Sequence, residues 1–450
     1  MRMLAQARPR LRPASLIPLY LTLICLPYAV GLWLGRLPMR GVYTEAVTLL
    51  TLAGMAVLLV QFFLSGRVEL VNHIAGVDES LRWHRKVGEI LALIFLLHPF
   101  LILAPRILVS GGFAGAELWS MFSQPLVRTG FYAWGALLVL VLVAMFRDRL
   151  ALSYEAWRIS HGVAAAAIAI LATDHAINVG RHGMVISGYN QFWLAACALS
   201  VMALFNNYLL RPLARRRRPF RLVSVEAAGR SDWLVTLEKD GSFPFSFTAG
   251  QFVWINTSGN PFSLVEHPFS IASAPSQLPR LQFIVRALGD FTGQLGDLAP
   301  GQRVYLDGPH GAFTLSPSGA EGIGLIAGGA GIGPIMGLLR HLAADGDQRP
   351  IRLIYGNQTC DQMVLQDEIA DLCAQLDCEQ ILAVVAPPAK FSGHKGVIDR
   401  AMLAQTLPAE SRLTWDHYVC GPPIMVKAVA EHLRGLGVPP GRIIYEQLAF

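Results

Sequence analysis

The chain has 450 residues, of which 53% are hydrophobic and only 15% are charged. This composition is too apolar for an ordinary soluble protein and predicts a membrane protein of two or three domains. The formal net charge of +6 would suit a nucleic-acid-binding protein, but the basic residues collect at the ends of apolar stretches, so we expect no nucleic-acid partner.

Six apolar stretches in the first half of the chain are mostly near the length of about 20 residues that a membrane-spanning helix needs. They cover residues 16–34, 47–64, 87–104, 131–146, 157–173 and 191–210. The first stretch follows several arginines, but it is long and no signal-peptide cleavage motif follows it, so we expect it to be retained. The sequence predicts a six-helix transmembrane bundle over 16–212, after a short cytoplasmic segment, 1–15.

The basic residues beside these stretches are distributed unequally between the two sides of the predicted membrane. The richer side holds the N-terminal arginines, the segments 82–86 and 147–158, and the run 215–218. The positive-inside rule therefore predicts a multi-pass protein of the cell membrane, surrounded by lipid, with both termini in the cytoplasm.

Two pairs of histidines repeat one interval: His84 and His98 are fourteen residues apart, and so are His161 and His175. Fourteen residues return a helical side chain to within about 40° of its starting face and move it about 21 Å along the axis. If the two helices face each other, each of the two levels can hold one haem iron between two imidazoles. We expect all four to be metal ligands, with His84 facing His161 near the cytoplasm and His98 facing His175 near the outside. Coincidental packing of histidines is the plain alternative.

The six cysteines are spread along the chain without CxxC spacing, which argues against iron-sulfur clusters and structural zinc. They are Cys25, Cys197, Cys360, Cys373, Cys378 and Cys420. Four of them fall in the second half of the chain, which we expect to lie in the cytoplasm, where thiols stay reduced.

The hydropathy pattern of the sequence changes after the arginine run 215–218. Short alternating apolar and polar runs, separated by glycine and proline, predict a small antiparallel β-barrel over 213–318. From 319 to 450, strand candidates alternate with helical stretches, which predicts an α/β Rossmann-like nucleotide domain with a parallel sheet.

A glycine-rich loop, Gly328 to Pro334, follows a predicted strand and precedes a predicted helix. Glycines at such a position let backbone N–H groups approach a pyrophosphate, and the helix N-terminus favours its negative charge. The plain alternative is a tight turn that needs positive φ angles. The candidate nucleotide-binding residues here are Gly328, Gly329, Gly331, Gly333 and Pro334.

A second turn, Cys420 to Pro423, follows another strand candidate and would lie at the same carboxyl edge of the sheet. We expect Cys420, Gly421 and Pro422 to contact the nucleotide. As a pattern alone, the segment is also a strand-to-helix turn with proline at the start of the helix.

In the barrel region, the segment His267 to Ser273 contains an aromatic ring beside small hydroxyls. A flat isoalloxazine ring needs such groups for stacking and hydrogen bonding. This segment also fits an edge strand that contains a proline. Downstream, a cation, a flexible turn and a hydroxyl suit a phosphate group. The candidate flavin-binding residues are His267, Pro268, Phe269, Ser270, Ile271, Ser273, Arg286, Gly289, Phe291 and Thr292.

Together these features resemble the ferric reductase and NADPH oxidase superfamily, and the resemblance covers about residues 16 to 450. Members join six membrane helices with two bis-histidine haems to a ferredoxin-reductase-like FAD domain and a nicotinamide domain. The four histidines match the family's haem ligands in spacing and order. The family's HPFT/S, GDFT-like, GGxGxxP and CGPP motifs match 267–271, 289–292, 328–334 and 420–423.

The resemblance implies further site residues in the second half of the chain. Family members commonly end in an aromatic residue over the flavin, a role that would fall to Phe450, and we expect Ser270, Cys420 and Phe450 to be the catalytic residues. Tyr355 and Gly356 match the family's YGNR segment and would line the nucleotide site. In place of its arginine this chain has Gln358, which cannot make a charge-assisted contact to the 2′-phosphate of NADPH. The choice between NADH and NADPH therefore stays open.

The implied cofactors are FAD, two haem b groups and NAD(P)H. The implied activity is electron transfer from cytosolic NAD(P)H through FAD and the haems to an acceptor on the other side, either oxygen, giving superoxide, or a ferric chelate, giving Fe(II). Two alternative functions remain. The chain could be a membrane electron-supply subunit that reduces a protein partner, or a transporter whose histidines relay protons.

Overall fold

The computed structural model describes residues 25–30, 33, 40–65, 68, 71, 76–110, 114–180, 188–316 and 319–445. The chain divides into two compact units at the Arg211–Pro212 boundary. We call residues 9–211 the helical unit and residues 212–450 the two-sheet unit. The predicted division of the second half near residue 318 falls inside the two-sheet unit, between its two sheets, and stays a prediction.

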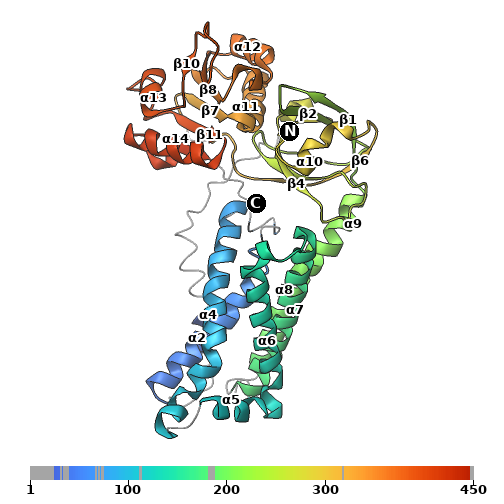
Figure 1. Ribbon diagram of the computed structural model, residues 1–450, viewed down its shortest axis with the longest axis vertical. Helices are drawn as coiled ribbons and strands as arrows, with labels where there is room; N and C mark the ends of the chain where they lie inside the picture. The colour runs from blue at the N-terminus through green and yellow to red at the C-terminus, as the bar shows by residue number, and fades with distance from the viewer. Residues whose placement is uncertain are drawn as a thin grey trace. The chain divides into compact units, whose positions relative to one another are not determined.

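The helical unit is built from long apolar helices (Figure 1). Among the described residues, five helices are long and apolar enough to cross a membrane. They are α2 (Val42–Val60), α4 (Val77–Ser110), α6 (Arg128–Met145), α7 (Tyr154–Val179) and α8 (Tyr189–Phe205), and the short α5 (Ala114–Phe122) follows α4. Five of the six predicted spans are therefore helical; the first, 16–34, lies mostly outside the described residues. The span of α8 runs on through a π turn into α9 (Arg211–Arg216).

The interior of the helical unit is small, and much of its apolar surface faces outward. Leu59 of α2, Ala169 of α7 and Trp193 of α8 pack in one buried cluster. By contrast, large apolar side chains such as Leu93 and Val139 are exposed. Outward-facing apolar side chains on long helices are what a lipid environment requires, and the fold therefore supports a membrane protein.

The first sheet of the two-sheet unit is antiparallel, with strand order β4-β3-β6-β1-β2-β5. Its strands are β1 (Phe220–Ala227), β2 (Asp232–Lys239), β3 (Phe252–Asn256), β4 (His267–Ser270), β5 (Arg280–Arg286) and β6 (Arg303–His310). Just beyond β4, the amide of Ala272 donates to the carbonyl of Gln282 in β5 (2.8 Å), which links the two ends of the strand order. Full closure into the predicted barrel stays a prediction.

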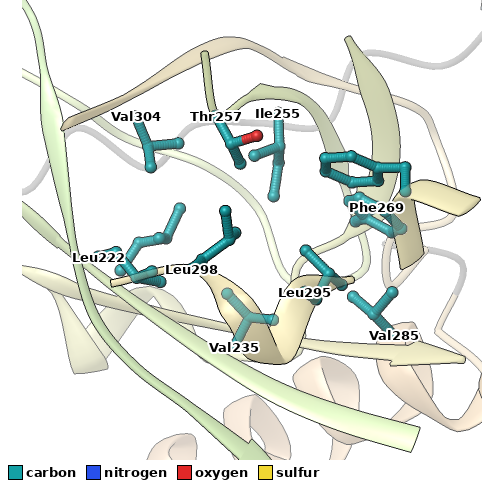
Figure 2. Close-up of a pocket in the computed structure, with 11 residues that line it drawn as sticks. Leu222, Val235, Ile255, Thr257, Phe269, Val285, Leu295, Leu298 and Val304 are labelled. Atoms are coloured by element: carbon teal, nitrogen blue, oxygen red, sulfur yellow. The ribbon is translucent and has the colours of Figure 1, made fainter. Parts of the chain in front are cut away.

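Side chains from all six strands of this sheet line one apolar interior (Figure 2). Leu222, Ile255 and Val285 are among them, and the void that remains is only about 10 Å³. A void of this size is at the lower limit for one water molecule, and apolar walls offer that water no hydrogen bond. The interior is therefore a packed core, and any ligand must bind at the sheet's surface or edge.

The second sheet is parallel throughout, with strand order β10-β9-β8-β7-β11-β12. Its strands are β7 (Ile323–Gly328), β8 (Ile351–Asn357), β9 (Cys378–Val384), β10 (His394–Lys395), β11 (Asp416–Cys420) and β12 (Ile443–Tyr445). The order reverses between β7 and β11, and such a switch point is where open α/β sheets bind ligands, at the carboxyl ends of the strands. The predicted α/β domain is thus present.

Helices cover both faces of the parallel sheet (Figure 1). They are α11 (Ile332–Asp345) and α12 (Gln366–Gln375) on one face, and α13 (Arg400–Thr406) and α14 (Pro423–Gly435) on the other. Successive strand residues point to opposite faces, so Leu325 packs with the first pair and Ile326 with the second. This burial on both faces explains why these strands read as continuous apolar runs in the sequence.

Candidate functional site

The structure brings His84 of α4 and His161 of α7 together, with ring centres 6.2 Å apart at an interplanar angle of 65°. An imidazole nitrogen about 2 Å from a metal has its ring centre about 3 Å from that metal, so two opposed ligands have centres about 6 Å apart. The separation therefore fits one iron between the two rings.

A second contact fixes the orientation of His84. Its Nδ1 lies 3.1 Å from the carbonyl oxygen of Gln61, at the end of α2. If Nδ1–H donates this hydrogen bond, Nε2 keeps its lone pair for a metal, which is the usual arrangement of metal-bound histidines. The sequence analysis missed Gln61, because a backbone acceptor leaves no signature in residue type.

His98 of α4 and His175 of α7 form the other level of the predicted site. Their Nδ1 atoms, like that of His161, are buried without a hydrogen-bond partner. His175 also lies against Gly130 of α6, where an added Cβ would come within 2.5 Å of its Nδ1. Burying an imidazole nitrogen without a hydrogen-bond partner costs folding free energy. A nitrogen that binds a metal would no longer carry this cost.

Within the described residues there is no group of three or more His, Cys, Asp or Glu side chains that could hold a metal ion. A haem site does not need one, since the porphyrin supplies the other four ligands and the protein only the axial pair. The pair His84 and His161 thus fits haem, and the role of all four histidines as ligands belongs to the proposal below.

The glycine-rich loop lies at the switch point of the parallel sheet. Gly329 has φ +53°, in the left-handed region that favours glycine. A Cβ added at Gly331 would come within 2.6 Å of the amide nitrogen of Gly421, beyond β11. The loop and the second predicted turn therefore pack directly against each other, with no room for side chains. Gly333 and Pro334 are buried at the start of α11, and Pro422 and Pro423 begin α14 as a strand-to-helix turn.

Arg286, at the end of β5 in the antiparallel sheet, lies against the glycine-rich loop. A Cβ added at Gly329 would lie 2.6 Å from its Nη1. The guanidinium is held by Asp232, with Nε–Oδ1 and Nη2–Oδ2 distances of 3.1 and 3.2 Å. The aspartate is almost fully buried and is the direct cross-strand neighbour of Arg286. The sequence analysis missed Asp232, because only the strand register places the two residues opposite each other.

The two predicted flavin segments also meet. The ring of Phe291 in α10 (Asp290–Gly293) stacks on His267, with centres 3.8 Å apart and planes at 15°. The hydroxyl of Thr292 accepts from the amides of Leu288 and Gly289, both at 3.0 Å, and so shapes the turn itself. Pro268 and Ser270 lie with Phe269 on the half-buried β4, which is an end strand of the order, so the edge-strand interpretation also holds.

Three predicted contact residues have side chains that are committed elsewhere. Ser273 accepts a 2.6 Å hydrogen bond from the amide of Gln282, and Ile271 is fully buried in the core of the antiparallel sheet. Tyr355 is also fully buried, its hydroxyl accepts from the amide of Val364, and burial raises its pKa to about 12. Gly356 lies against Ile398, Cys420 is half-buried at the end of β11, and Phe450 lies outside the described residues.

Two arginines that the sequence did not point to, the buried Arg340 and the half-buried Arg215, make polar bridges within the two-sheet unit. Arg340 of α11 makes a two-point ion pair with Glu368 (2.6 and 2.8 Å) and donates to the carbonyl of Ala272 (2.9 Å), next to the predicted flavin segment. Arg215 of α9 binds Glu266 (2.5 Å) and Asp307 (2.9 Å). A charged residue on the apolar face of α11 was a readable signal for Arg340.

Three family models match successive parts of the chain. Residues 50–172 match the ferric reductase like transmembrane component, residues 219–313 an FAD-binding domain, and residues 325–431 an oxidoreductase NAD-binding domain. The chain is therefore an oxidoreductase with FAD- and NAD-binding domains and a membrane component.

Curated relatives include reductase components of propane 2-monooxygenases. That of Gordonia sp. (strain TY-5) is 33% identical over 230 residues, which is 48% of this chain and 63% of the relative. That of Mycolicibacterium goodii is 28% identical over 257 residues, 56% of this chain and 73% of the relative. The chain spans between 59% and 73% of the length of the first such relatives.

Among solved structures, the ferredoxin reductase in carbazole 1,9a-dioxygenase is 27% identical, with a TM-score of 0.44 over 51% of this chain and 68% of that one. The relatives and this structure are similar proteins, and none of them assigns an acceptor to the chain. The order of the three family matches, membrane component first, then FAD-binding and NAD-binding domains, matches the ferric reductase and NADPH oxidase superfamily, as the motifs predicted.

Proposed function

We propose that the chain transfers electrons across the cell membrane, from NAD(P)H bound by the two-sheet unit to an acceptor on the opposite side. The observation that carries the proposal is the pair His84 and His161, whose rings lie 6.2 Å apart on two membrane-spanning helices. Ionisable side chains are costly in such helices and usually functional. Rings that pack edge to face lie at similar separations, and the feature that favours metal ligation over packing is the fourteen-residue interval that both histidine pairs share.

In this proposal four imidazoles hold two haem b groups. His84 and His161 hold the inner one, and His98 and His175 the outer one. When bound, FAD takes a hydride's two electrons and haem iron takes single electrons, so together they turn a hydride donor into a source of single electrons. Held by one imidazole from each of two helices, haem would supply single-electron transfer to an acceptor that does not bind the metal.

The two-sheet unit supplies the nucleotide chemistry. The amides of the loop from Gly328 and the N-terminus of α11 suit a pyrophosphate, and Arg286, held by Asp232, places a positive charge at that loop. The stacked segments around His267 and Phe291 suit the flavin. Ser270, Cys420 and Phe450 are proposed as the residues nearest the reacting rings, and both termini are proposed to lie in the cytoplasm.

The acceptor in this proposal is a small molecule on the outer side, either oxygen, giving superoxide, or a ferric chelate, giving Fe(II). A second candidate is an electron-supply subunit that reduces a protein partner. The relatives named as reductase components of oxygenases favour this second candidate, because such components deliver electrons to another protein.

Absorption spectra of the detergent-purified chain under argon test the proposal. Addition of NADH or NADPH should bleach the flavin and produce the bands of reduced b-type haem. Rapid reoxidation by air with superoxide formation would indicate an oxidase, and reoxidation by ferric citrate alone would indicate a reductase. Reduced haem that neither acceptor reoxidises quickly would favour the protein partner. A purified chain without haem bands would contradict the proposal.

A further inference from the structure

Two cysteine thiols lie in close contact where α12 leads into β9. Cys373 is in the last turn of α12 and Cys378 is the first residue of β9. Their sulfur atoms are 2.6 Å apart, and both are free thiols. Non-bonded heavy atoms settle at about 3.5 Å or more, whereas the sulfurs of a disulfide are about 2.0 Å apart. A slight change of side-chain torsion therefore suffices to bring the two sulfurs to bonding distance.

The backbone on both sides of the pair is fixed. The amide of Leu376 donates to the carbonyl of Cys373 (3.3 Å), and the amide of Ile351 donates to the carbonyl of Asp377 (2.7 Å). Cys378 itself is paired in register with Ile351 of β8. Because the connection between the two cysteines is short and anchored, the two side chains are held beside each other.

From this geometry we propose that Cys373 and Cys378 form a reversible disulfide, a redox modification site in the nucleotide domain. The site lies at the amino end of β9, opposite the sheet edge that holds the glycine-rich loop. The proposal does not depend on the haems or on the electron acceptor. In a compartment that keeps thiols reduced, a disulfide of this kind is transient and responds to oxidants.

The chemistry of closure needs one oxidant, for which we name hydrogen peroxide. The thiolate of Cys373 attacks one oxygen of the peroxide, the O–O bond breaks, hydroxide leaves, and a sulfenic acid forms. The thiolate of Cys378 then attacks that sulfur, the S–S bond forms, and a second hydroxide leaves. The two thiol protons convert both hydroxides into water, and the two sulfurs together lose two electrons. A small dithiol reverses the reaction.

The surroundings assist the first step. Either thiol can donate across this contact. A hydrogen bond from Cys378 stabilises the thiolate of Cys373 and so lowers the pKa of Cys373. Arg352 of β8, which pairs with Glu379 at 2.9 Å, adds a positive charge near Cys378. Cys378 is half-buried, so a small oxidant can approach the pair, whereas Cys373 is buried at 9% exposure.

The disulfide would join α12 to the sheet. The same helix carries Glu368, the partner of Arg340, which in turn holds the carbonyl of Ala272. Because a covalent bond between α12 and β9 restricts the unfolded chain, it should raise the thermal midpoint of the two-sheet unit by a few degrees.

The test uses the full chain, purified under reducing conditions, treated with graded hydrogen peroxide, alkylated with N-ethylmaleimide and digested after glutamate residues. The segment 369–379 contains both cysteines of the pair, and Cys360 lies in another peptide. We expect peptide 369–379 to lose two hydrogen atoms and carry no alkyl group, and dithiothreitol to restore two alkylation sites. The untreated and oxidised proteins should differ in thermal midpoint as stated.

Cys373→Ser should keep Cys378 alkylatable after mild oxidation, whereas Cys378→Ser should leave Cys373 as a sulfenic acid that forms no disulfide and that dithiothreitol returns to the thiol. Both variants should remove the thermal shift, and Cys360→Ser should change neither result. Cys378→Ala serves as a second variant if the serine variant folds poorly. The inference fails if, at doses that oxidise Cys360, both cysteines of the wild-type pair remain alkylated or end as separate sulfinic acids.

Discussion

At the scale of single residues, each candidate site depends on a contact that one particular residue makes. Gln61 offers its carbonyl to His84, and Asp232 is buried opposite Arg286. Gly331 leaves space that only a hydrogen can occupy beside Gly421. Each of these residues acts on a neighbour that the sequence motifs did identify, and each can be changed singly.

The outer histidine pair gives the first prediction. His98→Leu should remove one of two haems and stop electron transfer to an external acceptor, while reduction of FAD by NAD(P)H continues, because the two-sheet unit is untouched. Haem content per chain and anaerobic flavin bleaching measure the two effects. His161→Leu should remove the other haem, and retention of both haems by His98→Leu would show that the ligands are misassigned.

The glycine-rich loop gives the second prediction. In Gly331→Ala the new Cβ would lie 2.6 Å from the amide of Gly421, so the loop must move away from β11 at a cost of about 1–3 kcal/mol. We expect the KM for the nucleotide to rise about tenfold, with FAD content unchanged. Gly441→Ala is the matched control, because a Cβ there meets no atom within 4 Å. Equal KM values for the two variants would refute this role of the loop.

A buried histidine outside the membrane gives a pH prediction. His417 of β11 is fully buried, its Nε2 bonds to the carbonyl of Arg412 at 2.8 Å, and burial lowers its pKa below the ordinary 6.5. The unfolded chain then binds a proton that the folded chain does not. This contribution to the free energy of unfolding is complete above pH 6.5 and is lost as the pH falls below it, by at most about 1.4 kcal/mol per pH unit.

Urea unfolding between pH 7.5 and 5.5, followed by release of FAD, measures this slope. His417→Asn should flatten it. An identical slope in wild type and His417→Asn would contradict the assignment.

At the scale of elements, α11 and α12 connect the two sheets of the two-sheet unit. Arg340 of α11, almost fully buried, bridges Glu368 of α12 and the carbonyl of Ala272. The short helix α9 is likewise joined to the antiparallel sheet by Arg215, whose partner Glu266 precedes the predicted flavin segment. The packing of helix on sheet was predictable from apolar periodicity, but these polar bridges were not, because they depend on which residues the fold makes neighbours.

Arg340→Met should lower the free energy of unfolding by about 2–3 kcal/mol, since the carbonyl of Ala272 and the carboxylate of Glu368 both lose their partner. The cost is below that of a fully buried pair, because 37% of the Glu368 side chain is exposed to water. Arg352→Met is the matched control: its partner Glu379 is 62% exposed, so we expect less than about 1 kcal/mol. Urea unfolding compares the two, and equal losses would contradict a bridging role for Arg340.

At the scale of the whole molecule, the sequence predicted the order of the helical unit, the antiparallel sheet and the parallel sheet. Hydropathy and motif spacing are local properties, so they can be read without knowing the fold. The five long apolar helices of the described residues, the antiparallel strands and the parallel α/β pattern all follow from apolar runs and alternation that are visible in the sequence. The positions of Asp232, Gln61 and Arg340 could not be read this way, since strand register and helix contacts bring together residues far apart in the chain. Tyr355 is the opposite case. The motif match predicted that it lines the nucleotide site, but its ring is fully buried in the core.

The central claim is that electrons cross the membrane through this single chain. Its most direct measurement uses sealed proteoliposomes that contain the purified chain and an entrapped, impermeant ferric acceptor, with NADH or NADPH added outside. The account predicts reduction of the entrapped acceptor, which His98→Leu abolishes while external flavin reduction persists. If the wild-type chain oxidises external nucleotide but leaves the entrapped acceptor oxidised in intact vesicles, the account is contradicted.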